Sequence, residues 1–207
     1  MERLKQISES RMQRVPLQFS RFLIHRINWN ERLIGISGAR GTGKTTLLLQ
    51  YMKSRVPKQA ESLYVSLDDI FFTETPLIFF AEEYYKKGGD YLFLDEVHKY
   101  PNWSQELKNI YDNIPDLKIV FTSSSALDIY KGSHDLSRRA IVYNLPGLSF
   151  REFIELKARF SFPALPLEEI LEGGKDLIYQ VTEKTKPLQL FNEYLQTGYY
   201  PFFVESP

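Results

Sequence analysis

The stretch GARGTGKTT at residues 38–46 decides the fold, because it follows directly after the short apolar run LIGIS at residues 33–37. Its spacing, G-x-x-x-x-G-K-T, is that of a complete P-loop. A tight loop with little side-chain bulk turns consecutive backbone N–H groups inward, and these donors bind phosphate together with the positive end of the following helix. The pattern predicts a nucleotide site formed by Gly38, Ala39, Arg40, Gly41, Thr42, Gly43, Lys44, Thr45 and Thr46.

Two residues of this loop have side chains suited to binding a nucleoside triphosphate. Lys44 is expected to reach the β- and γ-phosphates, and the Thr45 hydroxyl is expected to ligate Mg²⁺. A glycine-rich turn that holds nothing is the alternative. The predicted strand before the loop and the predicted helix TTLLLQYMKSR after it favour the P-loop interpretation.

A second motif, YLFLDEVHKYP at residues 91–101, ends an apolar run in two carboxylates. In a doubly wound sheet the carboxyl ends of the strands face the ligand. Asp95 is therefore predicted to hold Mg²⁺, and Glu96 to orient and polarise the attacking water. The alternative is that both are ordinary loop carboxylates, which the preceding P-loop and strand disfavour.

Hydroxyl residues end another apolar run, KIVFTSSSALDIY at residues 118–130. A strand that delivers polar residues at its end places Ser123 or Ser124 beside the γ-phosphate. Serines also commonly cap helices, and ALDIY resembles a helix start. The residues alone leave these two interpretations open.

Two arginines, Arg138 and Arg139, precede the run AIVYNL. An arginine can neutralise the charge that develops on a transferred phosphoryl group. The alternative is a solvated pair or a salt bridge to Asp68 and Asp69, and without further context we favour that alternative.

Strand and helix patterns alternate along the chain, which predicts an α/β fold with a five-stranded parallel sheet covered on both faces. Residues 1–30 are expected to be an N-terminal helical segment, residues 31–148 the P-loop core, and residues 149–207 a small helical lid or linker. Thr75 is expected to cap the helix TPLIFFAEEYYKKGG. The strands are predicted in RLIGIS, SLYVSL, YLFLDE, KIVFTS and AIVYNL.

Composition limits the function classes. The 207 residues contain 26 lysines and arginines, 26 aspartates and glutamates and no cysteine. The charge balance gives no support for nucleic acid or membrane as a partner. Disulfides are excluded, no apolar stretch is long enough for a membrane span, and a cytoplasmic location is expected. The three scattered histidines favour no metal other than Mg²⁺.

Taken together, the motifs resemble the AAA_14 family of bacterial and archaeal AAA-type ATPases, which a DUF4143 region usually follows. The resemblance runs from about Leu33 to Phe153 and rests on ISGARGTGKTTLL, YLFLDEVHKYPNW, IVFTSSSALDIY and LSRRAIVYNLPGLSFREF. It implies catalytic roles for Glu96, Lys44, Ser124 and Arg139, with Ser124 as a sensor. Members usually carry Gly-Ser-Ser where this chain has Ser123 to Ser125. The end, FNEYLQTGYYPFF, resembles the linker into the C-terminal region, so we expect a truncated chain or a naturally short member.

The resulting hypothesis is a Mg²⁺-dependent P-loop hydrolase that binds ATP and ADP and couples hydrolysis to a conformational change. A homo-oligomer and a protein partner are the expected partners besides the nucleotide. The rival class is a nucleotide-gated switch with little turnover, and Glu96 favours the hydrolase because a switch does not require it. A nucleotide kinase needs an acceptor pocket and an arginine-rich lid, which residues 149–207 do not indicate.

Overall fold

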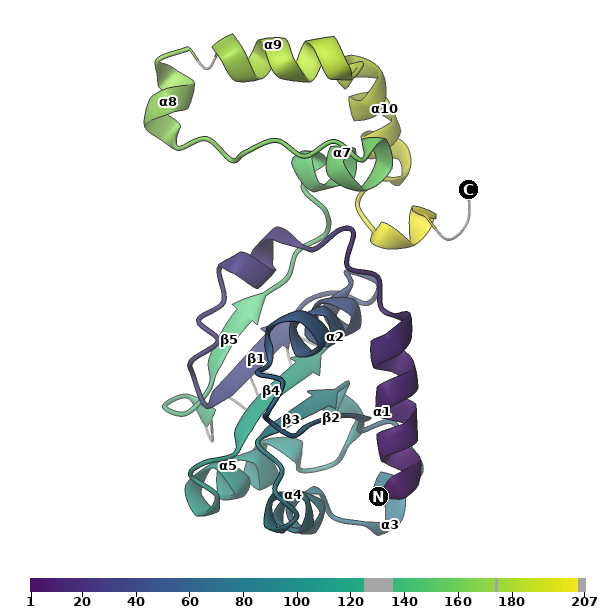
Figure 1. The fold of residues 1–207 in the computed structure, drawn as a ribbon, viewed down its shortest axis with the longest axis vertical. Helices are drawn as coiled ribbons and strands as arrows, with labels where there is room; N and C mark the ends of the chain where they lie inside the picture. The colour runs from purple at the N-terminus through teal and green to yellow at the C-terminus, as the bar shows by residue number, and fades with distance from the viewer. Residues whose placement is uncertain (125–135, 174, 205–207) are drawn as a thin grey trace. The chain divides into compact units, whose positions relative to one another are not determined.

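The computed structural model describes residues 1–124, 136–173 and 175–204 and divides into two units, Met1–Pro146 and Gly147–Pro207. The first unit is built on five parallel strands in the order β2-β3-β4-β1-β5 (Figure 1). This confirms the predicted α/β fold with a five-stranded parallel sheet. The strands are β1 Leu33–Ser37, β2 Ser62–Ser66, β3 Tyr91–Asp95, β4 Lys118–Ser123 and β5 Ile141–Asn144.

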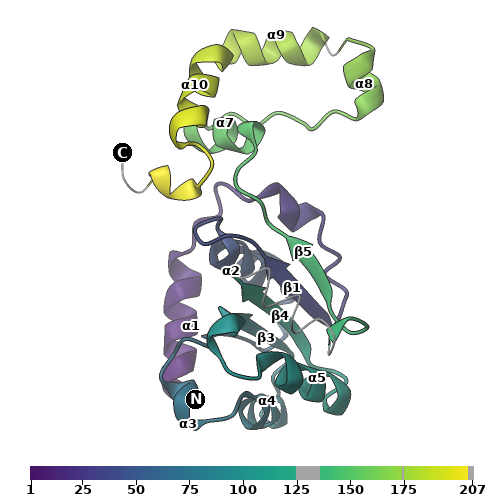
Figure 2. The ribbon, with the colours of Figure 1, turned by 180° about the vertical axis from the view of Figure 1, so that it is seen from behind.

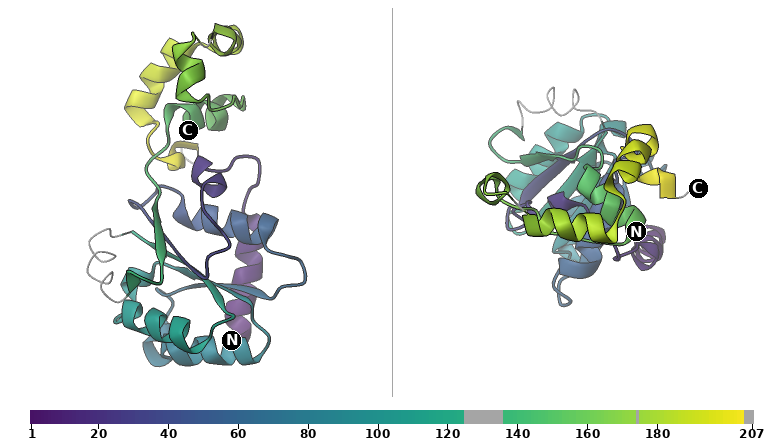
Figure 3. Two further views of the ribbon diagram at one scale, coloured as in Figure 1. Left: turned by 90° about the vertical axis from the view of Figure 1, so that its left-hand side faces the viewer. Right: turned by 90° about the horizontal axis from the view of Figure 1, so that it is seen from above.

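Helices cover both faces of this sheet, as Figure 3 shows with α2 on one side and α4 and α5 on the other. Side chains alternate between the two faces, so that Leu92 and Leu94 of β3 join one buried cluster while Phe93 joins the other. Because both faces are covered, the central strands are apolar throughout. The helices are α2 Lys44–Arg55, α3 Phe71–Glu74, α4 Leu77–Lys86 and α5 Trp103–Asn113.

The N-terminal helix α1 (Glu2–Arg14) packs along β2, which is an edge strand of the sheet (Figure 2). The Tyr64 backbone N–H donates to the Ser8 hydroxyl at 3.0 Å, and Arg3 forms an ion pair with Asp69 at 3.0 Å. A short 3₁₀ helix, η1 (Phe22–His25), then leads toward β1. The region before the P-loop is therefore packed against the sheet.

The strand register brings several chain segments to one edge of the sheet. Ser37 of β1 lies opposite Ser123 of β4, and Ser66 of β2 lies opposite Asp95 of β3. Since all strands run in the same direction, the segments that follow β1, β3 and β4 leave the sheet at its carboxyl edge. A second 3₁₀ helix, η2 (Val97–Lys99), begins there after Glu96.

The second unit is helical. Its helices are α7 Phe150–Ala158, α8 Leu167–Leu171, α9 Lys175–Lys184, α10 Pro187–Thr197 and the 3₁₀ helix η3 Pro201–Val204. Ser149 and Glu152 form a reciprocal capping box at the start of α7. Within the unit, Phe150 packs edge-on against Phe191 of α10 at 5.1 Å. None of the described helices in either unit is long and apolar enough to cross a membrane.

Some local expectations were wrong. Thr75 does not cap α4; Pro76 occupies that position without a side-chain cap, and the free N–H groups of Leu77 and Ile78 donate to the Tyr100 hydroxyl and to Glu106 Oε2. Tertiary contacts therefore replace the local cap. The short helix α3 and the helix α9 were not predicted, and the helix start expected in ALDIY lies outside the described residues.

Candidate functional site

The P-loop residues form a backbone cradle between β1 and α2. Gly41 and Gly43 have φ angles of 83° and 91°, a left-handed conformation that favours glycine. A Cβ atom on Gly38 would lie 2.3 Å from the Leu145 carbonyl oxygen, so only glycine fits there. Ala39, Arg40, Gly41 and Thr46 are exposed, which leaves the tip of the loop open to a ligand.

Lys44 is folded back onto this loop. Its ammonium group donates to the carbonyl oxygens of Gly38 at 2.9 Å and Ala39 at 3.0 Å, and only 4% of the residue is exposed. Burial lowers the Lys44 pKa below its ordinary value of 10.5, while the charges of Glu96 and Asp95 act in the opposite direction. An anion in the cradle would give this buried cation a charged partner.

Arg21 holds the loop from behind and was not predicted to contribute to the site. It is 4% exposed, and its guanidinium donates to the Thr42 carbonyl oxygen and, at 2.8 Å, to the Pro146 carbonyl oxygen. It therefore ties the P-loop to the segment after β5. Arg21 lies seventeen positions before Gly38, and no spacing rule points to it.

Asp95 lies at the end of β3 and accepts hydrogen bonds from three hydroxyl groups. Thr45 and Tyr64 each donate to Oδ2 at 2.8 Å, and Thr122 donates to Oδ1 at 2.5 Å. The residue is 3% exposed, so these donors compensate a buried carboxylate. Burial, and then the neighbouring Asp95 charge, raise the pKa of Tyr64 and keep its hydroxyl protonated as a donor.

Glu96 follows in a left-handed backbone conformation with φ 57°, which is unusual for a residue with a side chain. Its N–H donates to the Thr122 hydroxyl at 3.0 Å, so one threonine orients both acidic residues. The Ser124 hydroxyl donates to Glu96 Oε1 at 3.0 Å. The structure thus brings Ser124 to Glu96.

His98 is a further neighbour of Glu96. Its Nε2 lies 3.3 Å from Glu96 Oε2, and its Nδ1 accepts from the Ser124 backbone N–H at 3.3 Å. Since Nδ1 accepts a hydrogen bond, Nε2 is the ring nitrogen positioned to donate to the glutamate. The position of His98 two residues after Glu96 is the signal in the sequence that could have indicated this contact.

The oxygen atoms around Asp95 fit a magnesium ion. The Thr45 hydroxyl and the Asp95 carboxylate lie 2.8 Å apart at the start of α2 and the end of β3, and hard oxygen ligands are those that Mg²⁺ prefers. Thr45 and Asp95 are therefore the residues that could hold it. Among the described residues, no group of three or more histidine, aspartate and glutamate side chains could form another metal site.

Arg139 is not brought to this site. It precedes β5 and therefore lies at the amino edge of the sheet, opposite the P-loop. Its Nε and Nη2 donate to the Asp112 carboxylate at 2.8 and 2.9 Å. The expected alternative of a salt bridge to Asp68 and Asp69 is wrong, because Asp69 pairs with Arg3 from α1. Arg138 is exposed.

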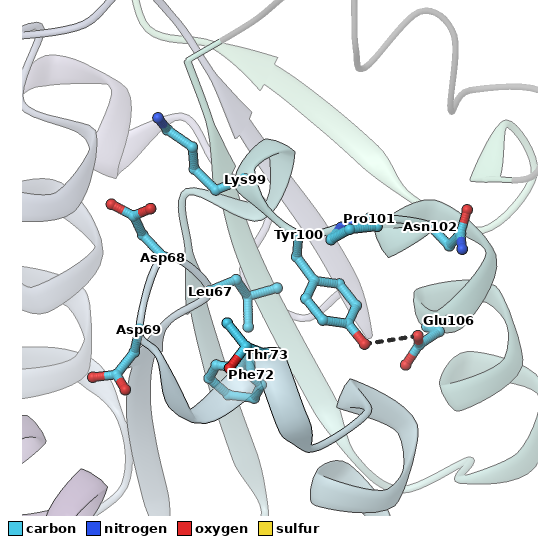
Figure 4. Close-up of a pocket in the computed structure, with 10 residues that line it drawn as sticks. All are labelled: Leu67, Asp68, Asp69, Phe72, Thr73, Lys99, Tyr100, Pro101, Asn102 and Glu106. Atoms are coloured by element: carbon cyan, nitrogen blue, oxygen red, sulfur yellow. Dashed lines mark hydrogen bonds between the residues drawn. The ribbon is translucent and has the colours of Figure 1, made fainter.

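A separate pocket of about 490 Å³ lies beyond the ends of β2 and β3 (Figure 4). Two of its carboxylates are already engaged, Asp69 with Arg3, and Glu106 with the Tyr100 hydroxyl at 2.9 Å. These groups hold α1 and the start of α4 in place. The pocket is lined by Leu67, Asp68, Asp69, Phe72, Thr73, Lys99, Tyr100, Pro101, Asn102 and Glu106.

The comparison with protein families agrees with these features. The family model AAA_14, described as an AAA domain, matches residues 30–154, and the chain belongs to this family. The chain is 33% identical over 192 residues to the uncharacterized protein MJ1637 of Methanocaldococcus jannaschii. The match covers 86% of this chain and 40% of that protein, so the chain spans less than half the length of this curated relative.

Solved structures similar to this chain include PCH-2 from C. elegans, at 22% identity and a TM-score of 0.45, with 83% of this chain and 46% of that chain covered. AMPPCP-bound DnaA from Aquifex aeolicus is 16% identical with a TM-score of 0.44, covering 92% and 58%. Membership of the family and the five-stranded parallel sheet define a P-loop nucleotide-binding fold of the AAA class.

Proposed function

We propose that the chain binds ATP with Mg²⁺ and hydrolyses it to ADP and phosphate. The observation that carries this proposal is the 2.8 Å hydrogen bond between Thr45 and Asp95, which joins two motifs fifty positions apart in the sequence. A P-loop threonine and a carboxylate at the end of another strand of the sheet are the pair that holds Mg²⁺ in P-loop hydrolases.

In this proposal the P-loop backbone binds the phosphates and Lys44 exchanges its two carbonyl partners for phosphate oxygens. That exchange replaces neutral acceptors with charged ones, which strengthens the hydrogen bonds of the buried ammonium. When bound, Mg²⁺ neutralises charge on the phosphate oxygens. Thr45 and Asp95 would hold the ion.

Glu96 is the proposed general base. Its side chain is 28% exposed, so water can reach it, while Ser124 and His98 fix its orientation. A carboxylate in this position can take a proton from water as the water attacks the γ-phosphate. Ser124 would exchange its hydrogen bond to Glu96 for one to the phosphate, which is the role of a sensor.

A nucleotide-gated switch is the second candidate function, and the position of Arg139 favours it. Arg139 is held by Asp112 at the edge of the sheet opposite the P-loop. An isolated chain would therefore lack its contribution to turnover. We infer that Arg139 serves the nucleotide of a neighbouring copy, so that a homo-oligomer hydrolyses ATP whereas a monomer mainly binds it.

The two candidates are distinguished by steady-state phosphate release. Purified chain is mixed with ATP and Mg²⁺, and the same reaction is run with EDTA. Mg²⁺-dependent release that increases per molecule with protein concentration supports the hydrolase in its oligomeric form. Tight binding of a fluorescent ATP analogue with no release at any concentration supports the switch, and absence of binding contradicts both.

A further inference from the structure

The helix α1 lies before the part of the chain that matches the family, which starts at residue 30. It nevertheless reaches the candidate metal site through one residue of β2. The Tyr64 backbone donates to Ser8 of α1, and the Tyr64 hydroxyl donates to Asp95 on the other side. Tyr64 thus contacts both α1 and Asp95.

Arg11 of α1 completes this connection. Its Nη1 donates to the Tyr64 hydroxyl at 3.2 Å, and its guanidinium carbon lies 5.3 Å from the centre of the Tyr64 ring. The ring itself is 1% exposed and packs in the core beneath α2. The tyrosine therefore has a fixed position that depends on contacts from α1 at both its backbone and its hydroxyl.

We propose that Tyr64 is a positioning residue for Asp95, that Arg11 is a positioning residue for Tyr64, and that α1 thereby sets the Mg²⁺ affinity of the nucleotide site. This inference rests on the proposed function, since it concerns the metal that Asp95 would hold. The helix α1, which lies outside the family domain, would then influence metal binding at the site.

The hydrogen bonds of Asp95 give the physical reason. Thr45 would hold the metal through a lone pair of its hydroxyl oxygen, and Tyr64 and Thr122 are the donors from outside the P-loop that keep the carboxylate oriented. A buried carboxylate with one donor fewer is less stable in its charged form and freer to rotate. Groups that orient metal ligands in this way typically change metal affinity by about 10–100-fold when they are removed.

The test of Tyr64 is the variant Tyr64→Phe, which removes the hydroxyl and keeps the ring. The matched control is Tyr84→Phe, because Tyr84 is also buried and donates to two backbone carbonyls, those of Glu61 and Tyr91, away from the site. Binding of a fluorescent ATP analogue is titrated at increasing Mg²⁺, and once in EDTA. Tyr64→Phe should need about tenfold or more Mg²⁺ for half-maximal enhancement of binding, with unchanged affinity in EDTA.

Variants of Arg11 and Arg3 distinguish the positioning of Tyr64 from the packing of α1 against the sheet. Both are exposed arginines on α1, but Arg3 pairs with Asp69 and Arg11 contacts Tyr64. Arg11→Gln should raise the Mg²⁺ requirement in the same direction by a smaller factor, and Arg3→Gln should leave it unchanged. Because both changes are at the surface, these variants keep the proposal testable even if Tyr64→Phe does not fold.

These experiments distinguish a failure of the proposed function from a failure of the positioning role of Tyr64. If the unaltered chain shows no Mg²⁺-dependent nucleotide binding, the proposed function is wrong. If that binding is present and Tyr64→Phe and Arg11→Gln behave like their controls, only the positioning role is wrong. A purely structural role of Tyr64 would lower the melting temperature without changing the Mg²⁺ titration, and that result would also overturn the proposal.

Discussion

The two edges of the sheet differ in how deeply their charged side chains are buried. At the carboxyl edge, Lys44 and Asp95 are 4% and 3% exposed and are surrounded by specific hydrogen-bond partners. At the amino edge, Arg139 and Asp112 form an ion pair whose side chains are 27% and 42% exposed. Burying a charge costs free energy that a surface pair avoids. A fold retains buried charges where hydrogen bonds compensate for their burial. Here the buried charges of Lys44 and Asp95 lie at the P-loop and beside it.

A catalytic role of Arg139 would make the amino edge of the sheet part of the chemistry as well. If Arg139 acts on a neighbouring copy, Arg139→Ala should lower turnover by about 10³–10⁵-fold, and the adjacent Arg138→Ala should change it little. Phosphate release per molecule should rise with protein concentration. Mixing Arg139→Ala with Lys44→Ala should restore part of the activity, because a mixed interface pairs an intact P-loop with an intact arginine.

Concentration-independent activity that Arg139→Ala leaves unchanged would contradict this prediction. Arg139 would then be only the partner of Asp112, and all of the chemistry would belong to the carboxyl edge.

A smaller effect is expected at Glu96. Glu96→Gln keeps the size of the side chain but cannot take a proton, so hydrolysis should fall by about 10²-fold or more while ATP binding is retained. Single-turnover hydrolysis and analogue binding measure the two properties separately. Glu83→Gln, at an exposed carboxylate of α4 paired with Lys87, is the control. Near-normal phosphate release from Glu96→Gln would show that another group is the base.

Lys44 should affect binding itself. Lys44→Ala removes a charge-assisted contact to phosphate, which costs about 1.5–3 kcal/mol, or roughly tenfold or more in affinity. Lys53→Ala is the matched control, since Lys53 lies on the same helix and donates to the backbone of Gln13 and Val15. Unchanged affinity of a folded Lys44→Ala protein, measured by analogue titration, would remove the P-loop assignment.

The smallest effect concerns the stability of the nucleotide-free chain. Because burial lowers the Lys44 pKa from 10.5, the unfolded chain binds more protons than the folded chain in the pH range just below 10.5. The free energy of unfolding should therefore gain a contribution from Lys44 as pH rises through that range. Lys44→Met should lack this contribution, so the difference between the two proteins in urea denaturation should change between pH 8 and pH 10. A constant difference would contradict it.

The sheet and the two main motifs were predictable because their signals are local. Apolar runs such as LIGIS mark strands covered on both faces, and the P-loop spacing fixes the backbone path on its own. The proximity of Asp95 to Thr45 also followed, since the carboxyl ends of parallel strands share an edge. The sequence therefore predicted the sheet and the residues gathered at its carboxyl edge.

The supporting residues of the site carry no such signal. Tyr64 and Thr122 reach Asp95 from positions 31 and 27 residues away, and Arg21 reaches the P-loop by way of a backbone carbonyl. The strand register of the folded chain decides which of the many tyrosines and threonines contact the Asp95 carboxylate. Adjacent residues of a helix point in directions about 100° apart, so Phe80 of α4 lies in the core while Phe79 beside it is 62% exposed.

The position of α1 has a consequence for how the domain behaves in solution. Unpaired strand edges are templates for pairing between molecules, and proteins commonly cover them. A fragment cut to the family boundary at residue 30 would uncover β2, whose central residues Leu63, Tyr64 and Val65 are apolar and suited to a β-strand. Such a fragment would expose an aggregation-prone strand, so the helix that precedes the family domain also covers the β2 edge against pairing with another molecule.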